Sequence, residues 1–122
     1  KKMMMTMNKY KSTPAPTPAK ASEYPTFTTY YKSFSSNLEL KMAIDQYAKK
    51  GRSSAAAQRY GYPIGQWDVS EVKSFYRVFE FQYTFNEDIS NWDVSSAKNM
   101  SYMFFHAESF NQDLSSWDTK SV

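Results

Sequence analysis

Three tryptophans at a fixed spacing constrain the fold of this chain more than any other feature. Trp67, Trp92 and Trp117 lie 25 residues apart, and each is followed by an aspartate. When residues 67–91 are aligned with residues 92–116, 10 of the 25 positions are identical. A fixed period of this length is typical of repeat proteins, in which each unit buries its apolar face against the next. Residues 64–122 are therefore predicted to form about two and a half repeats.

Each repeat is predicted to contain one short strand and one short helix. Residues 87–92 alternate polar and apolar side chains around Ile89, which is typical of a half-buried strand. The apolar residues that follow have the spacing of one helical face. They are Ala97, Met100, Met103, Phe104 and Ala107, and in the first repeat Val72, Phe75, Val78 and Phe79. The expected fold class is α/β, a leucine-rich-repeat-like solenoid with strands on one side and helices on the other.

Several segments resemble the repeat of a known family. They are FNEDISNWDVS (85–95), KNMSYMF (98–104) and FNQDLSSWD (110–118). The repeat of BspA-type leucine-rich-repeat surface proteins, FNQDISxWDVSxVTNMxxMF, is similar to all three. The resemblance extends over residues 37–122, although residues 75–79 depart from it in the first repeat. It implies a leucine-rich-repeat fold and a location at the cell surface or outside the cell.

The residues before the repeats are expected to form a leader, 1–36, and a helical cap, 37–63. Ser36 and Glu39 have the spacing of a capping box and predict a helix over residues 37–50, with Gly51 at its end. A second helix is predicted over residues 54–60, ending at Gly61. Both helices are expected to cover the first repeat, because an open end of a repeat array exposes its core.

The leader is rich in proline, lysine and tyrosine. Pro14, Pro16 and Pro18 alternate with Ala and Thr, which favours an extended polyproline segment. Four aromatic residues follow, Tyr24, Phe27, Tyr30 and Tyr31. They have two interpretations: they pack on the first helix, or they anchor the leader on a partner subunit.

Charge divides the chain into two parts. Residues 1–60 contain eleven Lys or Arg and three Asp or Glu, a net charge of +8, whereas residues 61–122 contain four and nine, a net charge of −5. The two parts are therefore expected to have different partners. The lysines are scattered rather than clustered, which disfavours nucleic acid. No apolar run is long enough to predict a transmembrane helix.

The chain begins without methionine and stops where a third repeat helix is expected. We therefore expect a piece of a longer repeat protein. Either further repeats follow, or another chain covers the edge at Leu114 and Trp117, which would otherwise be exposed.

Two rows of aspartates repeat with the tryptophans. Asp68, Asp93 and Asp118 form one row, and Asp88 and Asp113 form the other. Such rows can hold a cation, but the glycine-rich loops of calcium-binding repeats are missing. The favoured interpretation is that each aspartate accepts hydrogen bonds from its own turn. Asn86 and Asn111 are similarly expected to satisfy turn backbone in the interior.

No residue set points to catalysis. His106 is the only histidine, its counterpart in the first repeat is Phe81, and the chain has no cysteine. A nucleophile with its base, a zinc site and a disulfide framework are therefore not expected. No cofactor is predicted.

The predicted function is that of a non-catalytic interaction scaffold that binds through the repeats. The partners expected are proteins or a larger assembly, with a glycan as a further option. The binding residues predicted on the strand side are Glu87, Ser90, Asn91, Gln112, Ser115 and Ser116, together with the leader aromatics Tyr24, Phe27, Tyr30 and Tyr31. The alternative is a structural subunit of a large complex, anchored by its extended leader.

Overall fold

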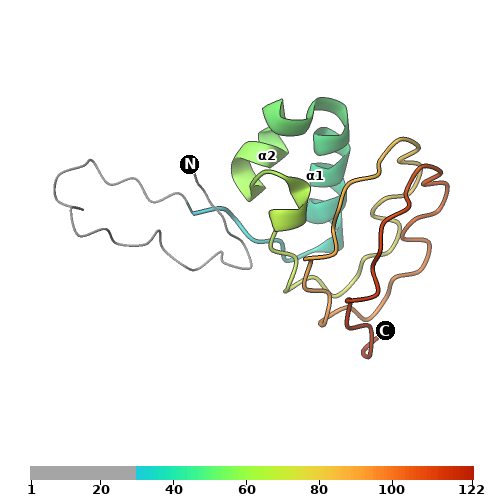
Figure 1. Cartoon of the computed structure of the whole chain (residues 1–122). Helices are drawn as coiled ribbons and strands as arrows, with labels where there is room; N and C mark the ends of the chain where they lie inside the picture. The colour runs from blue at the N-terminus through green and yellow to red at the C-terminus, as the bar shows by residue number, and fades with distance from the viewer. Residues whose placement is uncertain (1–29) are drawn as a thin grey trace.

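The computed structural model describes residues 30–122, and its regular elements are all helical. They are α1 (Asn37–Lys50), the 3-10 helix η2 (Gly51–Ser53), α2 (Ala55–Tyr60) and the 3-10 helix η3 (Ile64–Gln66). Figure 1 shows α1 and α2 side by side, with the chain from residue 67 onward winding next to them without regular elements.

Helix α1 begins and ends where its capping residues predict. The Ser36 side chain accepts a hydrogen bond from the Glu39 amide at 3.1 Å. The Glu39 carboxylate returns to the amide of Ser35, at 3.1 Å, instead of that of Ser36. At the other end Gly51 adopts a φ of 53°, and its amide donates to the carbonyl of Tyr47. The prediction for residues 37–50 is confirmed.

Helix α2 is short and is capped in the same way. The Ser54 hydroxyl accepts from the amide of Ala57 at 3.0 Å. Gly61 follows the helix with a φ of 111°, a backbone conformation that favours glycine. The predicted second helix is therefore also confirmed.

The predicted α/β solenoid is wrong. Residues 30–122 contain no strand or sheet, only one isolated parallel bridge between Ser74 and Asn99. The first strand, expected from Ile64, is replaced by η3. The segments predicted as repeat helices are series of turns.

The backbone shows why the repeat helices do not form. Arg77, Phe81, Tyr102 and His106 have φ values of 59°, 63°, 56° and 57°, and an α-helix needs a φ near −63°. Between these residues, backbone amides donate to the carbonyl three positions earlier in the chain, as the Val78 amide does to the Phe75 carbonyl at 3.3 Å. Successive turns of this kind place apolar residues three and four positions apart, so their spacing imitates that of a helix.

Local hydrogen bonds also prevent the expected strand at residues 87–92. The Asp88 carboxylate accepts the amide of Ser90 at 2.8 Å, which bends the chain. The Trp92 amide then donates to the carbonyl of Ile89 at 3.1 Å. These groups are used within the repeat and cannot pair with a neighbouring strand.

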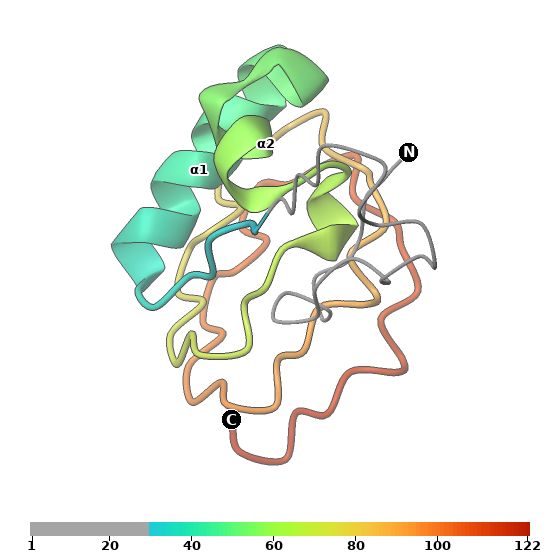
Figure 2. The same ribbon diagram turned by 90° about the vertical axis from the view of Figure 1, so that its left-hand side faces the viewer.

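The two repeats nevertheless lie against each other in register. Four backbone amides of the first repeat donate hydrogen bonds to backbone carbonyls of the second repeat, with donor–acceptor distances of 2.7 to 3.2 Å. The pairs are Phe75 to Asn99, Arg77 to Ser101, Phe79 to Met103 and Phe81 to Phe105. Figure 2 shows the corresponding parts of the chain running side by side.

Tryptophan and phenylalanine rings fill the interior of the repeats. Trp67 and Trp92 are buried and stack with centroids 6.5 Å apart. The Trp92 indole N–H donates to the carbonyl of Ile64 at 2.8 Å, and that of Trp117 donates to Ile89 at 3.1 Å. Trp92 is therefore buried between the two repeats, as the fixed spacing of a stacked repeat requires.

Helix α1 covers the other side of the first repeat, as predicted. The Asn37 amide group donates to the carbonyls of Ser74 and Tyr76 at 3.0 and 2.9 Å. The Lys41 ammonium donates to the carbonyl of Arg77 at 3.0 Å. These contacts give hydrogen-bond donors to three backbone carbonyls of the first repeat.

Candidate binding surface

Two series of turns, one in each repeat, carry the candidate binding surface. They cover residues 75–83 of the first repeat and 100–107 of the second. Within the first series Phe75, Val78 and Phe79 are buried, whereas Tyr76 and Phe81 are exposed. The turns therefore place some of their aromatic rings in the core and others in solvent.

The exposed rings form one cluster, which we call the aromatic surface. It consists of Tyr76, Arg77, Phe81, Tyr83, Tyr102, Phe105 and His106. Its Tyr and Phe side chains are 38% to 55% exposed, although residues of this kind are usually found inside. A contiguous group of exposed aromatic side chains is typical of an interaction site.

The rings touch one another without a gap. Tyr83 contacts Phe81 with centroids 6.1 Å apart, and Phe81 contacts Phe105 at 5.7 Å. Phe105 then meets Tyr102 at 5.6 Å, and Tyr102 meets Tyr76 at 6.1 Å, both edge to face. Edge-to-face packing stabilises aromatic pairs beyond their buried area, so the cluster is held in place before any partner binds.

Arg77 lies between two of these rings. Its guanidinium carbon is 5.0 Å from the centroid of Tyr76 and 4.9 Å from that of Tyr102. Its Nη1 atom also donates to the Glu80 carboxylate at 2.7 Å. The surface thus includes a cation whose charge is partly balanced by Glu80 and the tyrosine rings.

The backbone beneath the aromatic surface is strained. All four non-glycine residues with positive φ in residues 30–122 belong to the surface: Arg77, Phe81, Tyr102 and His106. A left-handed conformation costs such residues about 1–2 kcal/mol each. Strain of this kind persists where the fold fixes it, and it is concentrated at functional sites. The strain and the exposed rings therefore point independently to the same surface.

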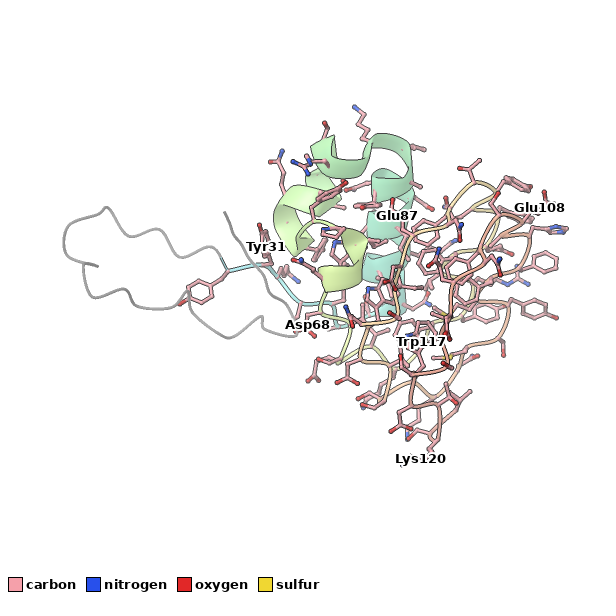
Figure 3. The ribbon with its side chains drawn as sticks, in the orientation of Figure 1. Tyr31, Asp68, Glu87, Glu108, Trp117 and Lys120 are labelled. Atoms are coloured by element: carbon pink, nitrogen blue, oxygen red, sulfur yellow. The ribbon has the colours of Figure 1, made fainter. Side chains whose placement is uncertain are left out.

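His106 is part of this surface. Its ring stacks on Phe81 at 5.4 Å and meets Phe105 at 4.3 Å. Its Nδ1 atom lies 3.8 Å from the carboxylate of Glu108, which is labelled in Figure 3. Within residues 30–122 no group of three or more His, Cys, Asp or Glu side chains could hold a metal ion.

Two of the predicted binding residues make contacts inside the fold. The Glu87 carboxylate accepts the Tyr47 hydroxyl at 2.8 Å, and burial, followed by this hydrogen bond, raises the pKa of Tyr47. The Gln112 side chain donates to the carbonyl and side-chain oxygens of Asn86 at 3.0 and 2.9 Å. Glu87 links the first repeat to α1, and Gln112 links the two repeats.

The other predicted polar residues lie in the turns near the tryptophans. Asn91, Ser115 and Ser116 are exposed, and Ser90 is half-buried. The Ser116 hydroxyl donates to the carbonyl of Ser90 at 3.3 Å. Because no strand forms here, these side chains do not make the strand face that the sequence predicted. Their role in binding stays a prediction.

The predicted leader aromatics are only partly described. Tyr30 is exposed, and the half-buried Tyr31 lies against Gly61, where a Cβ atom would come within 3.6 Å of its ring. Tyr24 and Phe27 lie outside the described residues. Tyr31 therefore packs next to the end of α2 and not on the first helix, where the first interpretation placed these rings.

The repeated aspartates hold turns, as the favoured interpretation predicts. Asp68, Asp93 and Asp118 each accept a backbone amide two residues ahead, at 3.0 to 3.1 Å. In the second row the side chain and amide of Ser90 lower the pKa of Asp88, and those of Ser115 lower the pKa of Asp113. The turn-capping prediction is confirmed.

Asn86 bonds to the turn backbone of the next repeat, as was predicted for the two asparagines. Its side-chain oxygen accepts the amide of Asn111 at 2.8 Å. Asn86 and Asn111 are both exposed, so the prediction that they lie in the interior is wrong.

The aromatic surface is not evident in the sequence because its rings have the spacing of core residues. Residues 75–85 contain six Phe or Tyr side chains, which is more than one buried stripe can accommodate. This excess was the signal available in the sequence. It did not reveal which rings face outward, because that depends on the positive φ values.

In the described part of the chain, no helix has the length and apolar character needed to cross a membrane.

Comparison with known proteins gives one match. A family model described as "Mycoplasma protein of unknown function, DUF285" matches residues 51–122, which include both tryptophan repeats. Neither the curated proteins nor the solved structures contain a match.

Proposed function

We infer that this chain, which belongs to the DUF285 family of Mycoplasma proteins, is a non-catalytic protein-binding module that uses its aromatic surface. The observation that supports this most is the contiguous set of exposed Tyr and Phe rings around Arg77. Tyrosine and arginine are enriched among the residues that dominate binding energy in protein interfaces. Rings already fixed by mutual contacts also lose little conformational entropy on binding.

A finer relationship, to BspA-type leucine-rich-repeat surface proteins, is also part of this proposal. The WDVS and FNQD segments support it, and it would place the module at a cell surface or outside the cell. The aromatic surface does not depend on that relationship.

A structural role in a large assembly is the alternative function. It depends on the leader, most of which lies outside residues 30–122. It stays a prediction from the sequence.

A peptide-display library selected on the immobilised full chain tests the proposed function. We expect enriched peptides that bind the wild-type chain and lose affinity for a Tyr102→Asn, Phe105→Ser variant by at least about tenfold. Asparagine is chosen at position 102 because it tolerates the positive φ found there. The matched control is Leu38→Ala, which removes an exposed apolar side chain from α1 and should leave binding unchanged.

A glycan array probed with the wild-type chain, the Tyr102→Asn, Phe105→Ser variant and the Leu38→Ala control tests for a carbohydrate ligand. Glycan binding that requires Tyr102 and Phe105, with no surface-dependent peptide, would replace the protein partner by a carbohydrate. If neither ligand class depends on the two residues, the aromatic surface is not the binding site.

A further inference from the structure

We propose that the aromatic surface of one molecule binds the proline-containing leader segment, residues 12–20, of a second molecule. This inference rests on the proposed function and names the partner of the same surface. It brings together the exposed rings and a segment that lies outside the described residues.

The chemistry of the segment matches that of the surface. The segment reads STPAPTPAK, with Pro14, Pro16 and Pro18 at alternate positions. Alternating prolines favour polyproline II, which has three residues per turn and no internal hydrogen bonds. Ligands of this conformation bind grooves and surfaces lined by aromatic side chains, because the stiff chain loses little entropy there.

The periodicity of that conformation gives the segment two apolar sides. With three residues per turn, Pro16 would share a side with Ala19, and Ala15 would share the next side with Pro18. Pro14, Thr17 and Lys20 share the third side, so the long Lys20 side chain can extend past the edge of the contact toward a carboxylate. A bound segment could therefore pack proline and alanine against rings such as Phe81 and Phe105 while its threonine faced solvent.

The charges of the two parts are opposite. Residues 1–29 contain five lysines and one glutamate, a net charge of +4, whereas residues 61–122 carry −5. Next to the aromatic surface Glu108 is 65% exposed, and its carboxylate faces His106 at 3.8 Å. Lys20, which follows the prolines, supplies a counter-charge for such a carboxylate. Arg77 is the one cation within the surface, and Glu80 pairs with it at 2.7 Å.

The position of the surface favours a second molecule as the source of the leader. Figure 3 shows Tyr31, where the leader joins the fold, and Glu108, next to the aromatic surface, on opposite sides of the protein. Pro18 precedes Tyr30 by 12 residues, which span at most about 43 Å when fully extended. A uniform sphere with the radius of gyration of such a domain, about 12 Å, has a radius of about 16 Å, so half of its circumference is about 50 Å, which Pro18 of the same molecule does not span. The leader of another molecule is free of this limit.

Peptide binding to the full chain tests the contact itself. The receptor carries Pro14→Gly, Pro16→Gly and Pro18→Gly, so that its own leader does not compete. The probe is a fluorescent peptide of residues 11–22, followed by anisotropy. We expect saturable binding that weakens by at least about tenfold when the three prolines of the peptide are replaced by glycine.

The same assay locates the contact on the surface. Adding Tyr102→Asn and Phe105→Ser to the receptor should weaken binding by at least about tenfold, whereas adding Leu38→Ala should change it by less than about twofold. Equal binding of the proline and glycine peptides would mean that charge alone holds the peptide. That result, or indifference to the two surface substitutions, overturns the inference.

Sedimentation of the unmodified full chain tests the source of the leader. We expect association that increases with protein concentration and is lost in the triple proline variant. If the wild-type chain stays monomeric while only the triple variant accepts the peptide, the leader binds its own molecule and the proposed source is wrong. Library peptides that bind the aromatic surface while the leader peptide does not would leave the proposed function standing and remove this inference alone.

Discussion

The tryptophan of each repeat fills the interior and also binds the neighbouring backbone. Trp92 is 3% exposed, and its indole donates to the carbonyl of Ile64 at 2.8 Å. Trp117 makes the equivalent bond to Ile89. The spacing that identified the repeats therefore reflects both ring packing and a hydrogen bond that joins one repeat to the previous one.

Two substitutions of Trp92 separate these contributions. Trp92→Phe keeps an aromatic ring but removes one of the two donors to the Ile64 carbonyl, which still accepts the amide of Trp67. The loss of this single hydrogen bond should cost about 0.5–1.5 kcal/mol. Trp92→Ala also leaves a cavity and should cost about 3–5 kcal/mol. Chemical denaturation of the full chain, followed by circular dichroism, measures both losses. Equal stability of the phenylalanine variant and the wild type would show that the hydrogen bond contributes nothing.

Gly65 allows a close approach between the chain entering the first repeat and the last part of that repeat. A Cβ atom at this position would lie 2.6 Å from the backbone oxygen of Asp88, so one of the two segments must move. Gly65→Ala should therefore destabilise the protein by about 1–3 kcal/mol, the usual cost of overpacking.

The control for this substitution is Ser53→Ala, because Ser53 is exposed and has an ordinary negative φ. Thermal melting should show a clear decrease for Gly65→Ala and little change for Ser53→Ala. Similar melting temperatures for both variants would contradict the close contact at Gly65.

At the scale of elements, the turn series combine strain with exposure. Tyr102 has a φ of 56° and contributes a ring that is 55% exposed. Asparagine at this position relieves part of the left-handed strain, about 1–2 kcal/mol, and forfeits ring contacts of about 0.5–1.5 kcal/mol. Tyr102→Asn should therefore leave the unfolding free energy within about 1 kcal/mol of the wild type while ligand binding weakens.

Denaturation and binding assays on the same preparation of this variant decide between two roles for Tyr102. A large loss of stability would show that the ring is structural. Retained binding would show that the strain serves some other purpose.

The elements that could be predicted from the sequence are those with local signals. Ser36, Glu39 and Gly51 define α1 through bonds within a few residues, and the aspartates define their turns in the same way. The predictions of repeat helices and strands were wrong because apolar spacing alone does not distinguish a helix from successive turns. The deciding quantity, the φ of residues such as Phe81, is fixed by pairing with the next repeat.

The outward direction of the aromatic rings could not be predicted for the same reason. It follows from contacts between residues about 25 positions apart, as between the amide of Phe81 and the carbonyl of Phe105. The polar residues chosen as binding candidates were those that an assumed strand would expose, and Glu87 and Gln112 instead bond within the fold.

At the scale of the whole molecule, the turn aspartates make the free energy of unfolding depend on pH. Hydrogen bonds from Ser90 and Ser115 lower the pKa of Asp88 and Asp113 in the folded protein. Their stabilisation is therefore complete above the unfolded pKa and is lost as the pH falls through the lower folded value. The denaturation midpoint should be steady near neutral pH and decrease below about pH 4.

Asp88→Asn is the control for this pH dependence, since it keeps an acceptor oxygen but does not titrate. Its midpoint should decrease less steeply in acid than that of the wild type. A parallel decrease in both proteins would assign the acid sensitivity to other carboxylates.

Amide chemical-shift mapping by nuclear magnetic resonance shows directly whether the aromatic surface is the binding site. The nitrogen-labelled full chain is titrated with a peptide selected on the wild-type protein by display. If the aromatic surface is the binding site, the shifts will concentrate in residues 76–83 and 101–108. Shifts concentrated instead in residues 87–91 and 112–116, around the polar turns, would contradict the account.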